Sequence, residues 1–203
     1  TDANGTKWFA GFASQSGLES GPSGTNVGGS NAITVYNRQV YVNGNEINYG
    51  ASYGLGGLGS GVSKLEAGDI LGCMCDGATG KVWFSRNGTY FMSPSTDNSG
   101  TTGDPAGGNH EIGTITNGTT EDVFFVIGAG TSAAAIFVNF GQDSQNVASA
   151  QSDGEGIGTF EYAPPTDYVS LCSSNLTTPT IGPTQSSQAE DHFNTVLYTG
   201  NAL

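Results

Sequence analysis

One stretch of the chain, residues 68–88, constrains the fold more than any other. It reads GDILGCMCDGATGKVWFSRNG, with two short apolar runs at 70–75 and 81–85. Asp76-Gly77 begins the turn between the runs, and Asn87-Gly88 follows the second run. Asp-Gly and Asn-Gly dipeptides beside short apolar runs are typical of β-hairpins, because these residues tolerate the backbone angles of tight turns. The stretch therefore predicts a β-hairpin followed by a second tight turn.

The rest of the chain continues this pattern of short strands and turns. Glycine accounts for 33 of the 203 residues and interrupts most windows in which a helical spacing of apolar residues would have to run. A continuous apolar run at 123–127 predicts a central strand covered on both faces, and the alternation at 136–140 predicts a strand with one core face. We therefore expect an all-β fold with one sizeable core. Besides the hairpin, the expected strands are 7–13, 32–36, 39–42, 122–127, 135–140 and 168–172.

The charge of the chain excludes several classes of partner. Five Lys and Arg residues face 18 Asp and Glu residues, which gives a formal net charge of −13. Nucleic acids and anionic membrane surfaces require a basic footprint, so neither is an expected partner. No run approaches the roughly 20 apolar residues of a membrane-spanning helix, and the chain starts at Thr1 with no methionine and no signal-peptide pattern. We expect a chain that has been processed or is a piece of a longer protein.

The three cysteines leave alternatives open. Cys73 and Cys75 are two residues apart in an expected strand, so both point to one face and are poorly placed to pair with each other. The favoured interpretation is that both, together with Cys172, are buried free thiols that behave as small apolar residues. A bridge from Cys73 or Cys75 to Cys172, or a metal site, remains an alternative.

Two long polar loops are candidates for a binding surface, because loops on a rigid scaffold commonly carry function. The first lies between Met92 and Ile112, and the second spans 142–158. Val82 and Phe84 should face the core, which turns Trp83 to the opposite face of its strand. Trp83 then either packs against a second layer or loop, or forms an exposed platform for a sugar or a protein. The candidate ligand-binding residues are Tyr53, Trp83, Tyr90, Asp104 and His110.

No pattern in the chain predicts catalysis. Residues 54–59 match G-x-G-x-x-G, but a poor helix start follows, so a flexible loop is the better interpretation. His110 and His192 stand in polar stretches, without a nucleophile elbow or a paired histidine. We expect no catalytic residues, no metal and no cofactor. Ca²⁺ is an alternative, because loop acids could supply oxygen ligands without forming an Asp-x-Asp-x-Asp loop. These acids are Asp97, Asp104, Asp143, Asp153 and Glu155.

The composition changes near residue 177. Residues 177–190 are rich in Thr, Pro, Ser and Gln, which is the character of an extended linker. A strand-like stretch, DHFNTVLYTG, follows from Asp191. The sequence therefore predicts a β-sandwich over residues 1–176, a linker over 177–190, and the start of a further β-module over 191–203.

The hairpin resembles the signature hairpin of SPRY domains, and three further segments match that family in the same order. They are WFAGF at 8–12, VNFGQ at 138–142 and FEYAPPTDYVSL at 160–171, so the resemblance covers about residues 7–172. It implies a bent antiparallel β-sandwich of the concanavalin-like jelly-roll type that binds partners and does not catalyse. SPRY domains usually carry two or three strands ahead of the first segment, where this chain has about seven residues. The resemblance therefore implies an exposed sheet edge that upstream sequence or another chain covers.

The Asn-Gly-Thr-Tyr at 87–90, the Gly-Asp-Pro at 103–105 and the tail after Asp191 resemble SPRY-containing tail or fibre proteins of marine bacteriophages. This resemblance implies a virion component, located on an extracellular appendage or otherwise surface-exposed. Expected partners are other virion proteins, copies of the chain itself, and a host cell-surface protein or glycan. Two alternatives stay open: a cellular SPRY adaptor that binds a short peptide, and a carbohydrate-binding β-sandwich with or without hydrolase activity.

Overall fold

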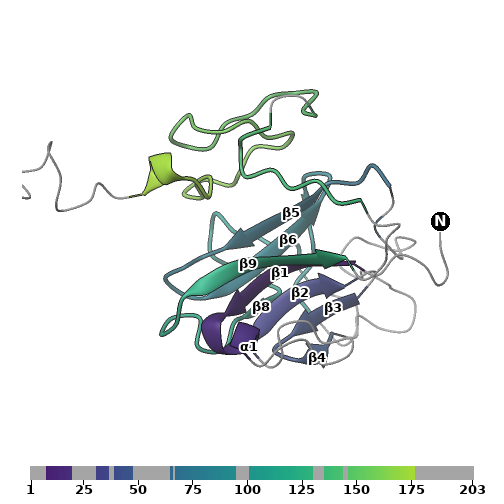
Figure 1. Cartoon of the computed structure of the whole chain (residues 1–203), viewed down its shortest axis with the longest axis vertical. Helices are drawn as coiled ribbons and strands as arrows, with labels where there is room; N and C mark the ends of the chain where they lie inside the picture. Colours follow the sequence, from purple (N-terminus) through teal and green to yellow (C-terminus); the bar gives the residue numbers. More distant parts are fainter. Residues whose placement is uncertain are drawn as a thin grey trace, which may run out of the picture. The chain divides into compact units, whose positions relative to one another are not determined.

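The computed structural model describes residues 8–19, 31–36, 39–47, 65, 67–94, 101–129, 135–143 and 146–176. The chain divides into one compact unit of residues 1–170 and a second of residues 171–203, and each is considered by itself. In the first unit the strands form two antiparallel sheets with almost no helix (Figure 1), which confirms the all-β sandwich. Tyr53, Asp97, the predicted linker 177–190 and the predicted module start 191–203 lie outside the described residues.

The first sheet has five strands in the order β4-β3-β2-β1-β9. Asn43 and Gly44 join β3 to β4 with positive φ angles of 48° and 85°. Two consecutive positive φ values define the tight hairpin turn that Asn-Gly favours, because Asn and Gly tolerate the left-handed region. The strands of this sheet are β1 (Trp8–Ser14), β2 (Ala32–Tyr36), β3 (Gln39–Val42), β4 (Asn45–Glu46) and β9 (Val123–Ala129).

The second sheet contains the predicted hairpin, which the structure confirms with Met74 paired to Trp83. In its turn the Asp76 carboxylate accepts bonds from the Ala78 amide (2.8 Å) and the Thr79 hydroxyl (2.5 Å). These bonds, with the Thr79 hydroxyl foremost, hold the pKa of Asp76 below its ordinary value. The sheet comprises β5 (Leu71–Cys75) and β6 (Lys81–Arg86), with β7 (Thr89–Tyr90) and β8 (Gly113–Thr114) each pairing with β6.

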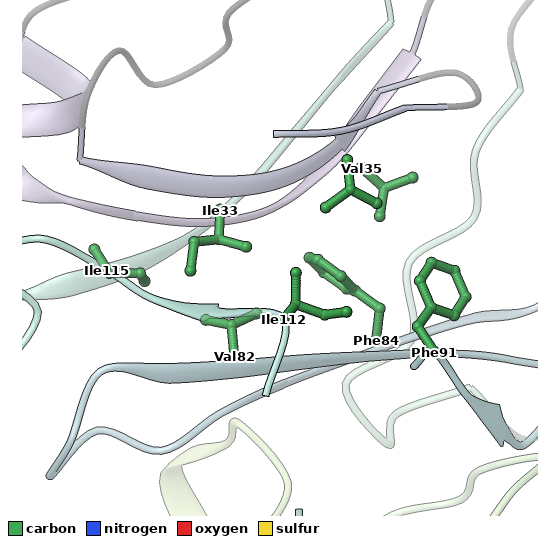
Figure 2. Close-up of a cluster of buried hydrophobic side chains, with 8 residues drawn as sticks. Ile33, Val35, Val82, Phe84, Phe91, Ile112 and Ile115 are labelled. Carbon is green, nitrogen blue, oxygen red and sulfur yellow. The ribbon is translucent and has the colours of Figure 1, made fainter. Parts of the chain in front are cut away.

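The core lies between the two sheets (Figure 2). Fully burying a large apolar side chain stabilises the fold by roughly 1.5–3 kcal/mol. Phe84 and Phe91 are among the largest fully buried side chains and are therefore among the largest contributors. Cys73 and Cys75 pack against this cluster from β5. The buried members are Ile33, Val35, Val40, Val82, Phe84, Phe91, Ile112 and Ile115.

Strand β1 packs closely against its neighbour and is followed by one short helix. Gly11 lies in the middle of β1, where a Cβ atom would overlap the carbonyl oxygen of Ile33 on the neighbouring strand. The helix α1 (Gln15–Glu19) follows β1 directly. The Glu121 carboxylate accepts a bond of 2.9 Å from the Ser16 amide at the start of this helix. A helix of five residues is too short to carry a periodic apolar pattern, and the Glu121 contact joins its first turn to a distant segment.

Three strand predictions are wrong, each for a physical reason. The run 123–127 forms a strand, but β9 lies at the edge of the first sheet and pairs only with β1 in the described part of the chain. An apolar run reports burial, and it does not report how many neighbours a strand has. Residues 135–140 and 168–172 form no strands. Their backbone groups instead meet side chains and turn partners, as with Gln142, whose amide nitrogen donates to the Val138 carbonyl over 2.9 Å.

The described part of the second unit is residues 171–176, which contain one 3₁₀ turn, η2 (Ser173–Asn175). Cys172 immediately precedes this turn, and the Asn175 side-chain amide donates to its Sγ atom over 3.7 Å. All three cysteines are free. Among the described elements, no helix has the length and apolar character needed to cross a membrane.

Candidate binding surface

The outer face of the second sheet is the side of β6 that points away from the core. Val82 and Phe84 occupy the core, and the alternation of the strand turns Trp83 outward, as the sequence predicts. Trp83 is nevertheless only 1% exposed. It is covered by residues 101–112, which we call the display loop, so Trp83 offers no platform at the surface.

Two side chains of β6 fix the backbone of the display loop. The indole Nε1 of Trp83 donates to the carbonyl oxygen of Asn109 over 2.8 Å. The Nζ atom of Lys81 donates to the carbonyl oxygen of Gly108 over 2.8 Å and lies 3.5 Å from the carboxylate of Glu111. Gly108, Asn109 and Glu111 of the loop are thereby bonded to side chains of one strand. Because the strand lies in the centre of its sheet, the loop is held by a rigid part of the fold.

The display loop also closes on itself. Asp104 and Asn109 exchange two backbone hydrogen bonds of 3.0 and 2.9 Å, and the Asp104 carboxylate accepts a bond of 3.0 Å from the Gly107 amide. The Asn109 side chain donates back to the Gly107 carbonyl over 2.9 Å. His110 follows with a φ angle of 55°, which turns the chain back toward β8. Much of the predicted long loop is therefore an ordered turn, held together by short polar side chains.

The outer side of the display loop presents several side chains to solvent. Gly103 and Pro105 are buried beneath it, while Asp104, Ala106, Asn109 and His110 are exposed. Two candidate residues from the sequence, Asp104 and His110, thus lie on one surface, and a third, Trp83, lies directly below it. Asp104 is committed to building the loop, whereas Ala106 and His110 are exposed positions at which a change would alter the surface alone.

Two tyrosines extend this region along the sheet. The ring of Tyr168 meets Trp83 edge to face, with centroids 6.1 Å apart and an interplanar angle of 85°. Tyr90 pairs with Ser85 across β6 and β7 and is half-buried. Burial raises the pKa of Tyr168 above its ordinary value, with smaller contributions from Asp76, Cys75 and Tyr90. Burial also raises the pKa of Tyr90, so both phenols stay protonated at neutral pH.

The second predicted loop is described at 142–143 and 146–158, and it is organised by buried polar groups. Asp153 is 5% exposed, and its carboxylate accepts bonds from the amides of Ile157 (2.8 Å) and Ser170 (2.8 Å) and from the Ser170 hydroxyl (2.9 Å). A weaker bond of 3.1 Å comes from the Glu155 amide. Four donors satisfy one buried carboxylate, as a buried charge requires. Asp153 therefore fixes this loop and is not available to a ligand.

The VNFGQ segment is likewise structural. Asn139 accepts bonds from the amides of Gly141 (2.7 Å) and Asp143 (3.2 Å), and it donates to the Thr159 carbonyl over 2.8 Å. The ring of Phe140 meets Phe125 of β9 edge to face, with centroids 5.4 Å apart. The side chains of Asn139 and Gln142 therefore hold backbone groups of this part of the chain in place.

The thiols of Cys73 and Cys75 and the carboxylate of Glu121 are engaged in packing or in hydrogen bonds. Burial raises the pKa of Cys73 to about 12, and burial followed by the nearby Asp76 raises that of Cys75 to about 12. The amide of Ser16, followed by other hydrogen bonds, lowers the pKa of Glu121 to about 2. Within the described ranges, no three His, Cys, Asp or Glu side chains gather closely enough to hold a metal ion. Asp104, Asp143, Asp153 and Glu155 thus do not come together as a Ca²⁺ site.

Sequence reasoning missed three residues that build the surface: Lys81, Asn109 and Tyr168. Lys81 had a signal, because it is one of five cationic residues and lies in the hairpin that dominates the sequence. Asn109 acts through its backbone carbonyl, which leaves no mark on the sequence. Tyr168 follows Pro164-Pro165 in the segment that resembles the SPRY family, but nothing in its neighbours points to Trp83.

We compared the chain with protein-family models, with curated proteins and with solved structures, and none of the three comparisons found a match.

Proposed function

We propose that this domain is a non-enzymatic structural and recognition module of a phage tail fibre or a related virion appendage. Its display loop binds a host surface component or a neighbouring virion subunit. The observation that carries the proposal is the fixation of the loop backbone by Trp83 and Lys81 beneath exposed side chains. A loop that is already ordered loses less conformational entropy when it binds a partner.

The character of the surface supports recognition by shape and hydrogen bonding. The exposed Asn109 and His110 supply polar contacts, and Ala106 leaves room for a partner to approach the loop closely. With a net charge of −13 the chain attracts only cationic partners from a distance, so electrostatic steering contributes little toward a neutral glycan.

A binding role is also supported by how the chain uses its reactive groups. The Ser170 hydroxyl donates a hydrogen bond to the Asp153 carboxylate, and this carboxylate also accepts hydrogen bonds from backbone amides. Glu111 is paired with Lys81. These side chains therefore hold the loops in place, which is consistent with a binding role.

The virion setting rests on the resemblance of the sequence to SPRY-containing tail proteins of marine bacteriophages. The Asn87-Gly88 turn, which carries part of this resemblance, is formed in the structure with positive φ angles of 49° and 79°. A fold built from short hairpins requires many turn residues, and this requirement accounts for the surface rich in Asn, Gly and Thr.

The experiment is a binding assay with two loop variants and one matched control. The domain, labelled with a fluorophore, is applied to a panel of candidate host cells and to an array of surface glycans. Ala106→Arg adds bulk and charge to the loop surface, and His110→Asn removes the imidazole while keeping a residue that tolerates positive φ. Ala67→Arg is the matched control for Ala106→Arg, because it places the same arginine at an exposed turn before β5, at the other end of the hairpin.

We expect the two loop variants to weaken binding by about tenfold, which corresponds to about 1.4 kcal/mol, with Ala67→Arg unchanged. All variants should keep the wild-type melting curve. Loss of binding only in Ala67→Arg would contradict the loop as the binding surface. Capture of short peptides, without binding to cells, glycans or virion subunits, would contradict the virion role in favour of a peptide adaptor.

A further inference from the structure

The two edges of the first sheet differ in how they are protected. Strand β4 is two residues long and ends in Glu46, whereas β9 is seven residues long and contains neither a charge nor a proline. Natural sheet edges are usually kept from pairing by shortness, by charged side chains or by proline. Strand β9 has none of these devices, and no described strand pairs with its outer side.

The hydrogen-bond pattern shows which groups of β9 face outward. The Gln15 amide donates to the Asp122 carbonyl, which makes these two a hydrogen-bonded pair at the start of the β1–β9 ladder. In an antiparallel ladder such pairs alternate, so Phe124, Val126 and Gly128 direct their backbone groups to β1. Val123, Phe125 and Ile127 therefore direct their N–H and C=O groups away from the sheet.

The side chains along this edge are apolar and partly exposed. Phe124 is 42% exposed on the outer face of the sheet, and Ile127 is 37% exposed on the face toward the core. Phe125 lies on the same face as Ile127 and packs against Phe12, with ring centroids 5.7 Å apart. Among the described residues, no strand pairs with these outward backbone groups, and apolar side chains flank them on both faces.

We infer that β9 pairs edge to edge with β9 of a second copy of this chain, around a two-fold axis at Val126. This register overlaps all seven residues. It places Phe125 opposite Ile127 of the second copy, and both residues direct their backbone groups outward, so each pair exchanges two hydrogen bonds. It also places Phe124 opposite Gly128 of the second copy, where the ring of Phe9 fills the space above the glycine. The strand is therefore complementary to itself.

The absence of charge along this segment allows a second copy to approach in this arrangement. Two chains of −13 repel each other wherever acidic surfaces meet, but residues 123–142 contain no charged side chain. In the antiparallel register, Asp122 of one copy and Asp122 of the other lie at opposite ends of the paired strands. Their separation is about 27 Å along the strands, well beyond the Debye length of about 8 Å at physiological ionic strength. The inference uses a different surface from the display loop and does not depend on the proposed function.

The first test is sedimentation equilibrium of the whole chain from about 1 µM to about 1 mM, which spans the affinities expected of such an edge. We expect a monomer–dimer equilibrium. Ile127→Lys places a cation against apolar groups and should raise the dissociation constant at least about tenfold. The matched control is Ile70→Lys, since Ile70 is 40% exposed just before β5. A chain that stays monomeric at about 1 mM, or dimerises equally well with Ile127→Lys, overturns the inference.

The second test needs no variant. Amide exchange is followed by NMR at the lowest and highest protein concentrations. The amides of Phe124 and Val126 should be protected at both, because they bond to β1, while those of Phe125 and Ile127 should gain protection only at the high concentration. Protection of Phe125 and Ile127 at both concentrations would show that the chain covers its own edge, and it would overturn pairing with a second copy.

Discussion

The indole nitrogen of Trp83 lies 2.8 Å from the carbonyl oxygen of Asn109, so a side chain of the second sheet holds the backbone of the display loop. The indole is almost wholly buried, and the carbonyl belongs to an exposed residue. A residue that the sequence nominates for ligand binding therefore acts by positioning the loop above it. This relationship links the hairpin to the surface that we propose as the binding site.

Replacement of Trp83 with Phe should loosen the display loop without unfolding the domain. The change removes the donor to Asn109 and reduces packing against Tyr168. We expect the free energy of unfolding to fall by about 1–3 kcal/mol and amide exchange at 103–111 to accelerate. Trp8→Phe on β1 is the matched control, since it should leave exchange in the loop unchanged. Unchanged exchange in Trp83→Phe would contradict the clamping role.

Replacement of Asp153 with Asn should destabilise the fold. In Asp153→Asn, one of two acceptor oxygens becomes a donor facing either the Ser170 amide and hydroxyl or the amides of Glu155 and Ile157. We expect a loss of at least about 1–3 kcal/mol in the free energy of unfolding, measured by chemical denaturation. Asp122→Asn, at an exposed position, should change it little. Equal effects of the two variants would show that the buried hydrogen bonds contribute nothing specific.

Cys73 and Cys75 should be inert in the folded protein. Burial raises the pKa of both thiols from 9.0 to about 12, which lowers the thiolate fraction at pH 8 about a thousandfold. We expect no alkylation by iodoacetamide until guanidinium unfolds the chain, as measured by peptide mass spectrometry. The raised pKa values also predict that the stabilisation from these thiols is complete below pH 9 and is lost as pH rises toward 12. Rapid labelling of either thiol in the native state would contradict the burial.

Glu121 should contribute to stability above pH 4.5 and lose that contribution at low pH. The Ser16 amide and other donors hold its pKa at about 2, below the ordinary value of 4.5. The sign follows from linkage: the contribution is fully present above pH 4.5 and is lost as pH falls through 2. The difference in melting temperature between the wild type and Glu121→Gln should therefore be largest above pH 4.5 and shrink toward pH 2. A difference that stays constant over this range would show that the charge of Glu121 plays no part.

Local chemistry predicted the parts of the fold that depend on neighbours in sequence. The hairpin of β5 and β6 was predicted from Asp76-Gly77 and the two apolar runs, and the turn at Asn87-Gly88 adopts the expected positive φ angles. The outward direction of Trp83 followed from simple alternation. These features need only the turn residues and the two-residue period of a strand.

Features that depend on distant partners were not predicted. The edge position of β9 is set by which other strands exist, and the apolar run at 123–127 carries no trace of that. The alternation at 136–140 favoured a strand, yet the segment is fixed by side chains of Asn139 and Gln142. The display loop depends on the carbonyl of Asn109, and a backbone acceptor is available at every position of a sequence.

The most direct test of the virion role is mass spectrometry of the polypeptide purified from its native source, with peptide mapping of every protein that accompanies it through particle purification. We predict that peptides from residues 8–176 are found in purified particles together with capsid or tail proteins, in a fixed stoichiometry. Recovery of the chain only outside particles, free of any virion protein, would contradict it.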